Sequence, residues 1–223
     1  MSLAVPADLV DPLVLANRIL YDQGVVDGLG HASVRHPTEP GVFLLSCNRA
    51  PGLVRRQDIT CYDFDGNTLS DQKERPYLER FIHAEIYRER PDVMAVVHSH
   101  SPSVIPFAIT HNALKPVFHM SGFLGEGSAH FEIREAGGNT DMLISSSYLG
   151  AALARSLGRH SCVLMRGHGS TVVGTSLQQV VYRAIYAEVN AKLQLGAQAL
   201  GEITFLLSLI HISEPTRLRR ISY

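Results

Sequence analysis

The chain has 223 residues, of which 45% are hydrophobic, and its formal net charge is -1. This length is enough for one substantial core, so we expect a single α/β domain. The near-zero charge gives no reason to expect nucleic acid or an anionic membrane as a partner. No apolar run approaches the ~20 residues of a membrane span. The first residues lack the pattern of a secretory signal. Three widely separated cysteines without a CxxC pair are typical of a reduced, cytoplasmic protein.

The first part of the chain predicts one helix followed by short strands. Apolar residues at helical spacing over residues 12–24 end at a glycine, which predicts an amphipathic helix. A tight turn, Gly28-Leu29-Gly30-His31, follows it. Strands are predicted at residues 32–35, 42–46 and 58–62, the last in a hairpin with a turn at 65–67.

The remainder alternates helices with apolar strands. A helix over residues 78–90 is expected to end before Pro91, because proline disfavours helix at the residue before it. Strands are predicted at residues 94–98, 116–119, 141–144 and 161–165, and helices at 149–157 and 177–200. This alternation predicts one α/β domain over residues 1–206.

The end of the chain changes character abruptly. Residues 208–223 form a basic segment that resembles the translation of a common sequencing adapter. We therefore interpret residues 207–223 as a non-native tail, with a natural solvated tail as the alternative.

Four residues suggest a metal site. His98 and His100 lie at a strand end two residues apart, so their imidazoles can share one face and converge on a first-row divalent ion, although such pairs are also common in polar loops. His168, between two glycines after another strand, adds a third imidazole or merely caps its loop. Glu79 near a helix start is a carboxylate ligand or a residue that complements the helix dipole. Together they would form a site with an exchangeable carboxylate, as a catalytic metal requires.

This set of residues resembles the class II aldolase/adducin superfamily. Glu79 lies nineteen positions before His98 in an Ala-Val-Val-His-Ser-His strand, a Gly-His-Gly turn follows far downstream, and the resemblance runs from about Pro12 to about Leu206. It implies a three-layer fold in which helices flank a central, mostly antiparallel sheet. It also implies a divalent ion, zinc or manganese, held by Glu79, His98, His100 and His168, and a homotetramer with sites at subunit interfaces. Adducin-like members lack the ligands and serve as binding or structural modules, an alternative that the complete set here disfavours.

Three positions depart from the sugar-phosphate aldolases of that superfamily. Those enzymes hold phosphate with small residues where this chain has His31, Asn48-Arg49 and Tyr77-Leu78. A phosphate cradle needs closely approaching amides and hydroxyls, and larger side chains would fill that space. We therefore predict a pocket for a small-molecule carboxylate instead, bound by guanidinium and aromatic groups, with ordinary surface residues as the alternative. The predicted substrate-binding residues are His31, Asn48, Arg49, Tyr77 and Arg80.

The segments around Glu79 and His168 resemble the decarboxylase branch of the superfamily. They read Arg-Pro-Tyr-Leu-Glu-Arg-Phe-Ile-His and Met-Arg-Gly-His-Gly-Ser. Members of that branch act on hydroxylated aromatic or pyridine dicarboxylates, such as 3-hydroxy-2-methylpyridine-4,5-dicarboxylate and dihydroxyphthalates. The resemblance implies a metal-dependent lyase that decarboxylates such a compound, with the metal stabilising developing negative charge. Glu79 or His119 is the expected proton donor, although His119 is equally readable as a satisfied core histidine. An aldolase or epimerase acting on a sugar phosphate or small hydroxy-aldehyde is the alternative.

Overall fold

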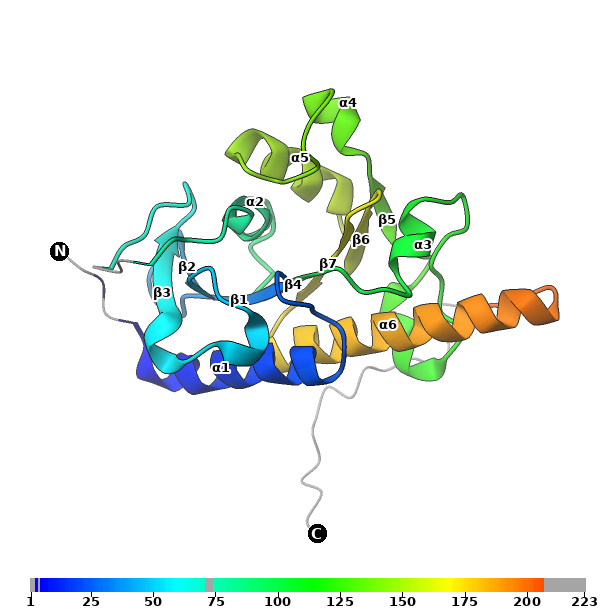
Figure 1. Cartoon of the computed structure of the whole chain (residues 1–223), viewed down its shortest axis with the longest axis horizontal. Helices are drawn as coiled ribbons and strands as arrows, with labels where there is room; N and C mark the ends of the chain where they lie inside the picture. Colours follow the sequence, from blue (N-terminus) through cyan, green and yellow to red (C-terminus); the bar gives the residue numbers. More distant parts are fainter. Residues whose placement is uncertain (1–2, 4, 71–73, 207–223) are drawn as a thin grey trace, which may run out of the picture.

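The computed structural model describes residue 3, residues 5–70 and residues 74–206, so the tail predicted at 207–223 lies outside the described residues. A seven-stranded sheet runs through the molecule in the order β3-β2-β1-β4-β7-β6-β5 (Figure 1). All neighbouring strands pair antiparallel except β5 and β6, which are parallel. The strands are β1 (His31–Arg35), β2 (Val42–Ser46), β3 (Ile59–Asp63), β4 (Ala95–Ser99), β5 (Ala129–Phe131), β6 (Cys162–Met165) and β7 (Gly169–Gly174).

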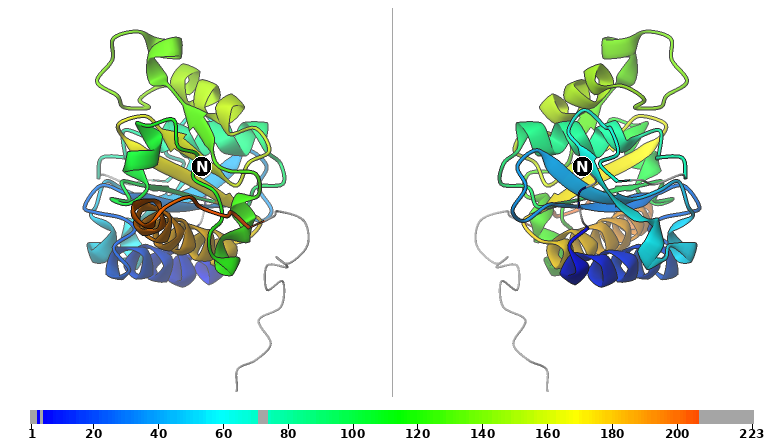
Figure 2. Two further views of the ribbon diagram at one scale, coloured as in Figure 1. Left: turned by 90° about the vertical axis from the view of Figure 1, so that its right-hand side faces the viewer. Right: turned by 90° about the vertical axis from the view of Figure 1, so that its left-hand side faces the viewer.

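Helices cover both faces of this sheet, which confirms the predicted three-layer α/β fold. Helices α1 and α6 lie on one face, and α2 and α5 lie on the other (Figures 1 and 2). Short turns of 3-10 helix, among them η3 (His119–Leu124), occur in the connections. The helices are α1 (Ala7–Asp22), α2 (Arg80–Glu89), α3 (Ile105–Ala108), α4 (Ile133–Gly137), α5 (Ser147–Leu157) and α6 (Leu177–Leu200).

Successive side chains of each strand point to opposite faces of the sheet, so the core has two halves. On β4, Val97 packs in the cluster beneath α1 and α6, whereas Val96 packs in the cluster beneath α2 and α5. Because side chains two apart on a strand share a face, His98 lies on the same side as Val96, toward α2. The two-residue repeat of side-chain direction along β4 therefore determines the face of the sheet on which a site at the end of this strand forms.

The first helix extends further than predicted. It begins at Ala7 rather than residue 12 and carries Pro12 inside it, and it ends at Asp22. Gly24 adopts a φ of 67°, the left-handed conformation that glycine accepts without strain. The glycine signal at the helix end is thus confirmed.

The strand predicted at residues 116–119 is wrong. This segment lies along α6, where Asn190 accepts from the backbone N–H of Val117 and donates to the carbonyl of Lys115. One turn further on, Gln194 accepts from the N–H of Lys115 and donates to the carbonyl of Ala113. Buried amide side chains of a helix therefore satisfy the backbone groups that a neighbouring strand would otherwise satisfy.

The strand predicted at residues 141–144 is also wrong. The N–H of Met142 donates to Thr140 Oγ1 and that of Leu143 donates to Asp141 Oδ1, so local side chains hold the backbone in a loop. Met142 has a φ of 71°, which does not occur in a strand. The sequence interpretation also missed β5, β7, α3 and α4.

No helix among the described residues is both long and apolar enough to cross a membrane. The three cysteines are free and buried.

Candidate metal centre

Three segments that are distant in sequence bring the four predicted ligands together. His98 lies on β4 and His100 directly follows that strand, while His168 lies in the turn between β6 and β7. Gly167 in this turn has a φ of 67°, and a Cβ at Gly169 would overlap the carbonyl oxygen of Ser99. The turn can therefore approach β4 only because glycine occupies these positions.

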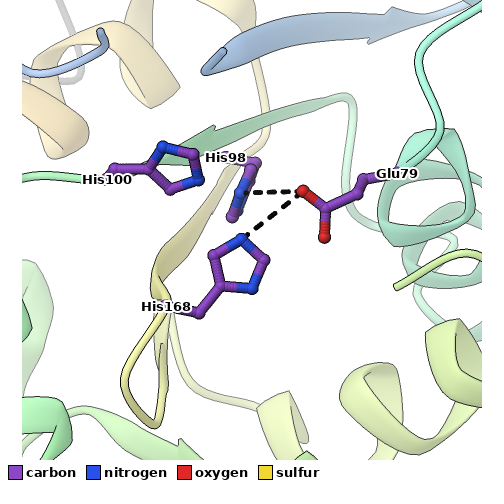
Figure 3. A group of neighbouring side chains, drawn as sticks. All are labelled: Glu79, His98, His100 and His168. Atoms are coloured by element: carbon purple, nitrogen blue, oxygen red, sulfur yellow. Dashed lines mark ion pairs between the residues drawn. The ribbon is translucent and has the colours of Figure 1, made fainter. Parts of the chain in front are cut away.

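Glu79 completes the group from the opposite side. It is the residue that precedes the first turn of α2, and its carboxylate points toward the imidazoles (Figure 3). Its Oε2 lies 3.4 Å from His168 Nε2 and 3.6 Å from His98 Nε2. One ligand atom from each of Glu79, His98, His100 and His168 lies within 4.8 Å of the others. The structure thus brings together all four predicted ligands.

Each imidazole uses its Nδ1 for a protein partner. His98 Nδ1 lies 3.1 Å from the carbonyl oxygen of Ser170, and His168 Nδ1 lies 3.0 Å from that of Met142. His100 Nδ1 lies 3.0 Å from Asp27 Oδ2. An acceptor at Nδ1 places the proton of a neutral imidazole there and leaves the lone pair of Nε2 directed into the group.

The charges of the group suit a cation. Burial opposes ionisation of Glu79, but the hydrogen bond with His168 and the nearby imidazoles lower the pKa of Glu79 to about 2. Burial lowers the pKa of His98 to about 3, so this imidazole is neutral at physiological pH. For His168, the contact with Glu79 outweighs burial and raises the pKa.

These residues fit a divalent metal ion. Nε2 of His98 and Nε2 of His100 are buried without a hydrogen-bond partner among the described residues. A buried nitrogen with a free lone pair is costly unless something binds it. Three imidazole nitrogens and one carboxylate are a donor set that zinc and other first-row divalent ions accept.

Tyr77 and His31, two predicted substrate-binding residues, lie next to each other beside this group. The His31 ring is 5.2 Å from the His98 ring and 4.4 Å from the Tyr77 ring. Both side chains are buried, with exposures of 1% for His31 and 4% for Tyr77. The hydroxyl of Tyr77 donates to the carbonyl of Arg49. His31 is thus buried directly beside the metal group.

The other predicted substrate-binding residues are more accessible. Asn48 is exposed, and Arg49 is partly exposed with its Nε 2.9 Å from Asp58 Oδ2. Arg80 donates to the carbonyls of Gly66 and Tyr77, so its guanidinium contacts backbone. The structure connects Arg49 to the site through Tyr77.

His119, the other predicted catalytic residue, is exposed. It opens η3, and its ring lies edge-on to Phe118 with centroids 4.7 Å apart. Among the described residues of one chain, no contact joins it to the four ligands. A catalytic role for His119 remains a prediction.

Several supporting residues were missed from the sequence. Asp27, which accepts from His100, lies in the turn after α1, where no motif marks it. His83 lies four residues after Glu79, one turn along α2, and contacts His31 with 2.6 Å between His31 Nδ1 and His83 Nε2. The i to i+4 spacing from a predicted ligand was the available signal.

The fold and the four-residue centre define the class of the protein. Residues 11–195 match the model of the Class II Aldolase and Adducin N-terminal domain, and the chain belongs to this family.

Among its relatives, decarboxylase tropJ of Talaromyces stipitatus is 41% identical over 196 residues, which cover 82% of this chain and 74% of that protein. The 3,4-dihydroxyphthalate decarboxylase of Arthrobacter keyseri is 31% identical over 204 residues, 86% of this chain and 79% of that protein. The crystal structure of L-fuculose-1-phosphate aldolase from Thermus thermophilus covers 89% of this chain and 100% of that chain with a TM-score of 0.72 and 20% identity, and so shares the fold. The prediction of a carbon–carbon lyase is confirmed at the level of class.

Proposed function

We propose that this lyase removes carbon dioxide from a hydroxylated aromatic or pyridine carboxylate in a reaction that depends on a divalent metal ion, zinc or manganese. The observation that supports metal dependence is the convergence of Nε2 of His98, Nε2 of His100, His168 and the Glu79 carboxylate within 4.8 Å. The names of the two decarboxylase relatives support the choice of reaction.

The residues of the four-residue group would hold the ion and keep water away from one side of it. Glu79 is ionised, and His98 and His100 have unshared Nε2 atoms, so these groups would hold the ion together with His168. When bound, the ion would stabilise the negative charge that develops on a substrate oxygen as carbon dioxide leaves. The burial of His98 and Glu79 excludes water from their side of the group, which strengthens electrostatic stabilisation there.

Substrate specificity would come from the residues that replace the phosphate loops of the aldolases. The Arg49 guanidinium and the exposed Asn48 offer donors to a carboxylate, and Tyr77 fixes the Arg49 backbone. The Arg80 guanidinium contacts backbone carbonyls, so of the predicted residues it is the weakest candidate for direct substrate contact. A bulky tyrosine and arginine leave little room for a phosphate cradle.

The proton donor is best sought outside the metal ligands. Glu79 is ionised at neutral pH and hydrogen-bonded to the Ile144 N–H, so it is better suited to binding the ion than to donating a proton. His119 is exposed at the start of η3. We propose that it reaches the metal centre of a neighbouring subunit in a cytoplasmic homotetramer, as the family resemblance implies.

The test is carbon dioxide release from a panel of hydroxy-aromatic dicarboxylates and sugar phosphates by metal-free protein, before and after addition of zinc or manganese. We expect metal-dependent release from an ortho-hydroxy carboxylate, and its loss in His98→Ala. The exposed His111→Ala is the matched control and should retain activity. Aldehyde formation from a sugar phosphate without carbon dioxide release would instead identify an aldolase.

A further inference from the structure

A chain of buried polar groups leads away from the metal centre through the core. His31 Nδ1 lies 2.6 Å from His83 Nε2, and His83 Nδ1 lies 2.6 Å from Ser33 Oγ. Ser33 Oγ in turn lies 2.7 Å from the hydroxyl of Tyr87. All four side chains are at most 1% exposed. Neither imidazole is ion-paired with a carboxylate among the described residues, and an uncompensated buried charge is costly, so both are neutral.

The number of protons fixes the donor-to-acceptor direction of this series of hydrogen bonds. Each of its four groups carries one mobile proton, and the three hydrogen bonds use three of them. The fourth proton must lie on Tyr87, on Ser33 or on the far nitrogen of His31. Tyr87 and Ser33 have no other acceptor within hydrogen-bond distance among the described residues, and a buried donor without an acceptor costs roughly 1–3 kcal/mol. His31 Nε2 has no acceptor among the described residues either, but its ring lies beside the metal centre, where water or a substrate oxygen can accept, so the fourth proton lies on His31 Nε2.

The surroundings of Tyr87 and His31, the two ends of this hydrogen-bonded series, agree with this placement of the proton. The Tyr87 ring is enclosed by Phe43, Phe64 and the Arg35 guanidinium. Burial raises the pKa of the Tyr87 hydroxyl, so this group keeps its proton and can donate it to Ser33. At the other end, His31 Nε2 makes no hydrogen bond with the described residues, and the ring lies beside the ligand His98.

We propose that Tyr87, Ser33 and His83 are positioning residues that hold His31 as its Nε2–H tautomer, which makes His31 a hydrogen-bond donor to an anionic oxygen of the substrate. The direction runs from the Tyr87 hydroxyl to Ser33, from Ser33 to His83 Nδ1, and from His83 Nε2 to His31 Nδ1. A donor suits a carboxylate or phenolate oxygen and does not suit an ammonium group or a metal ion. The role toward substrate rests on the proposed decarboxylase function, whereas the tautomer does not.

The tautomer can be measured in the unmodified protein. Long-range proton–nitrogen NMR correlations of protein labelled with nitrogen-15 in histidine distinguish protonated from unprotonated ring nitrogens, both in metal-free protein and after addition of zinc. We expect a proton on His31 Nε2 and none on His31 Nδ1 in both states. A proton on His31 Nδ1 overturns the proposal and would instead make His31 Nε2 available as a further metal ligand.

We call the hydrogen-bonded series Tyr87, Ser33, His83 and His31 the relay. Variants test whether the relay sets the tautomer of His31 and the binding of substrate. Ser33→Ala removes the donor to His83 Nδ1, so we expect a mixture of His31 tautomers and a KM for the carboxylate substrate raised roughly tenfold, with a smaller change in kcat. Ser33→Thr keeps the hydroxyl and should restore both. Tyr62→Phe is the matched control, because the Tyr62 ring packs on the same Phe43 and its hydroxyl has no partner among the described residues.

The outcomes separate the relay from the function. A wild-type tautomer and KM in Ser33→Ala overturn the relay even if the enzyme is a decarboxylase. If no carboxylate in the panel is turned over, the proposed function fails, while an Nε2 proton on His31 in the wild type and its loss in Ser33→Ala still support the relay.

Discussion

A hydrogen bond joins His100 to Asp27 at the edge of the four-residue group, with 3.0 Å between His100 Nδ1 and Asp27 Oδ2. The other oxygen of Asp27 accepts the N–H groups of Leu29 and Gly30. Both carboxylate oxygens are therefore engaged, one by the turn after α1 and one by the ligand. The turn that follows α1 thus fixes the orientation of the imidazole that follows β4.

Asp27→Asn should weaken metal binding without unfolding the protein. The amide can still accept from the turn, but it presents an N–H group to His100 Nδ1, which favours the tautomer with a proton on Nε2. We expect an affinity for zinc roughly 10–100-fold lower, measured by competition with a chromophoric chelator. Asp22→Asn, an exposed carboxylate at the end of α1, is the control and should bind zinc as the wild type does. Equal weakening in both variants would show that net charge, rather than the His100 contact, is responsible.

Metal binding should release a proton from His168 near neutral pH. The contact with Glu79 raises the pKa of His168, so a fraction of this imidazole is protonated in the metal-free protein, and this fraction grows as the pH falls toward that pKa. An ion needs the neutral form and must displace the proton. His98, with a pKa of about 3, has none to release.

Titration calorimetry in buffers of different ionisation enthalpy, repeated at several pH values, measures this release. Glu79→Gln removes the carboxylate that raises the pKa of His168, so the release should fall in that variant. A wild-type release that stays near zero as the pH is lowered from about 8 to about 6.5 would contradict the assignment of the raised pKa.

The four residues that the structure brings together could be singled out from the sequence because each lies at or near the end of a recognisable element. Apolar strands run into His98 and His168, and a helical pattern begins near Glu79. Strand periodicity placed His98 and His100 on one face, and the family resemblance joined Glu79 and His168 to them. The acceptors at their Nδ1 atoms could not be predicted in this way. They are two backbone carbonyls and one loop carboxylate, and these carry no side-chain pattern that connects them to a distant histidine.

The two wrong strands have a related cause. Residues 116–119 and 141–144 have strand-like composition, but side chains contributed by α6 and by neighbouring loop residues satisfy their amides. The N–H of Ile144 donates to the proposed ligand Glu79 at 2.9 Å, so a loop rather than a strand supports the carboxylate. Tertiary hydrogen bonds of this kind override local preference and leave no trace in periodicity.

Gly169→Ala should destabilise the protein and reduce metal binding together. A Cβ there would overlap the Ser99 carbonyl, so β7 must move away from β4 and carry the His168 turn with it. We expect a loss of about 1–3 kcal/mol in the free energy of unfolding, measured by denaturant titration. Gly196→Ala in α6 meets nothing within 4 Å and should instead stabilise by about 0.5–1 kcal/mol. Unchanged zinc affinity in Gly169→Ala would mean that the turn does not depend on this close approach.

Mixed oligomers should reveal whether His119 acts across a subunit interface. His98→Ala lacks a ligand and His119→Gln lacks the proposed proton donor, so each variant alone should be nearly inactive. If each site combines the ligands of one subunit with His119 of its neighbour, joint dissociation and reassembly should restore roughly a quarter of wild-type carbon dioxide release, because half of the subunits keep the ligands and half of their neighbours keep His119. His98→Ala mixed with His100→Ala, which both damage the same centre, should recover nothing. Full activity of His119→Gln alone would remove this histidine from the mechanism, and an inactive mixture would place its action within its own chain.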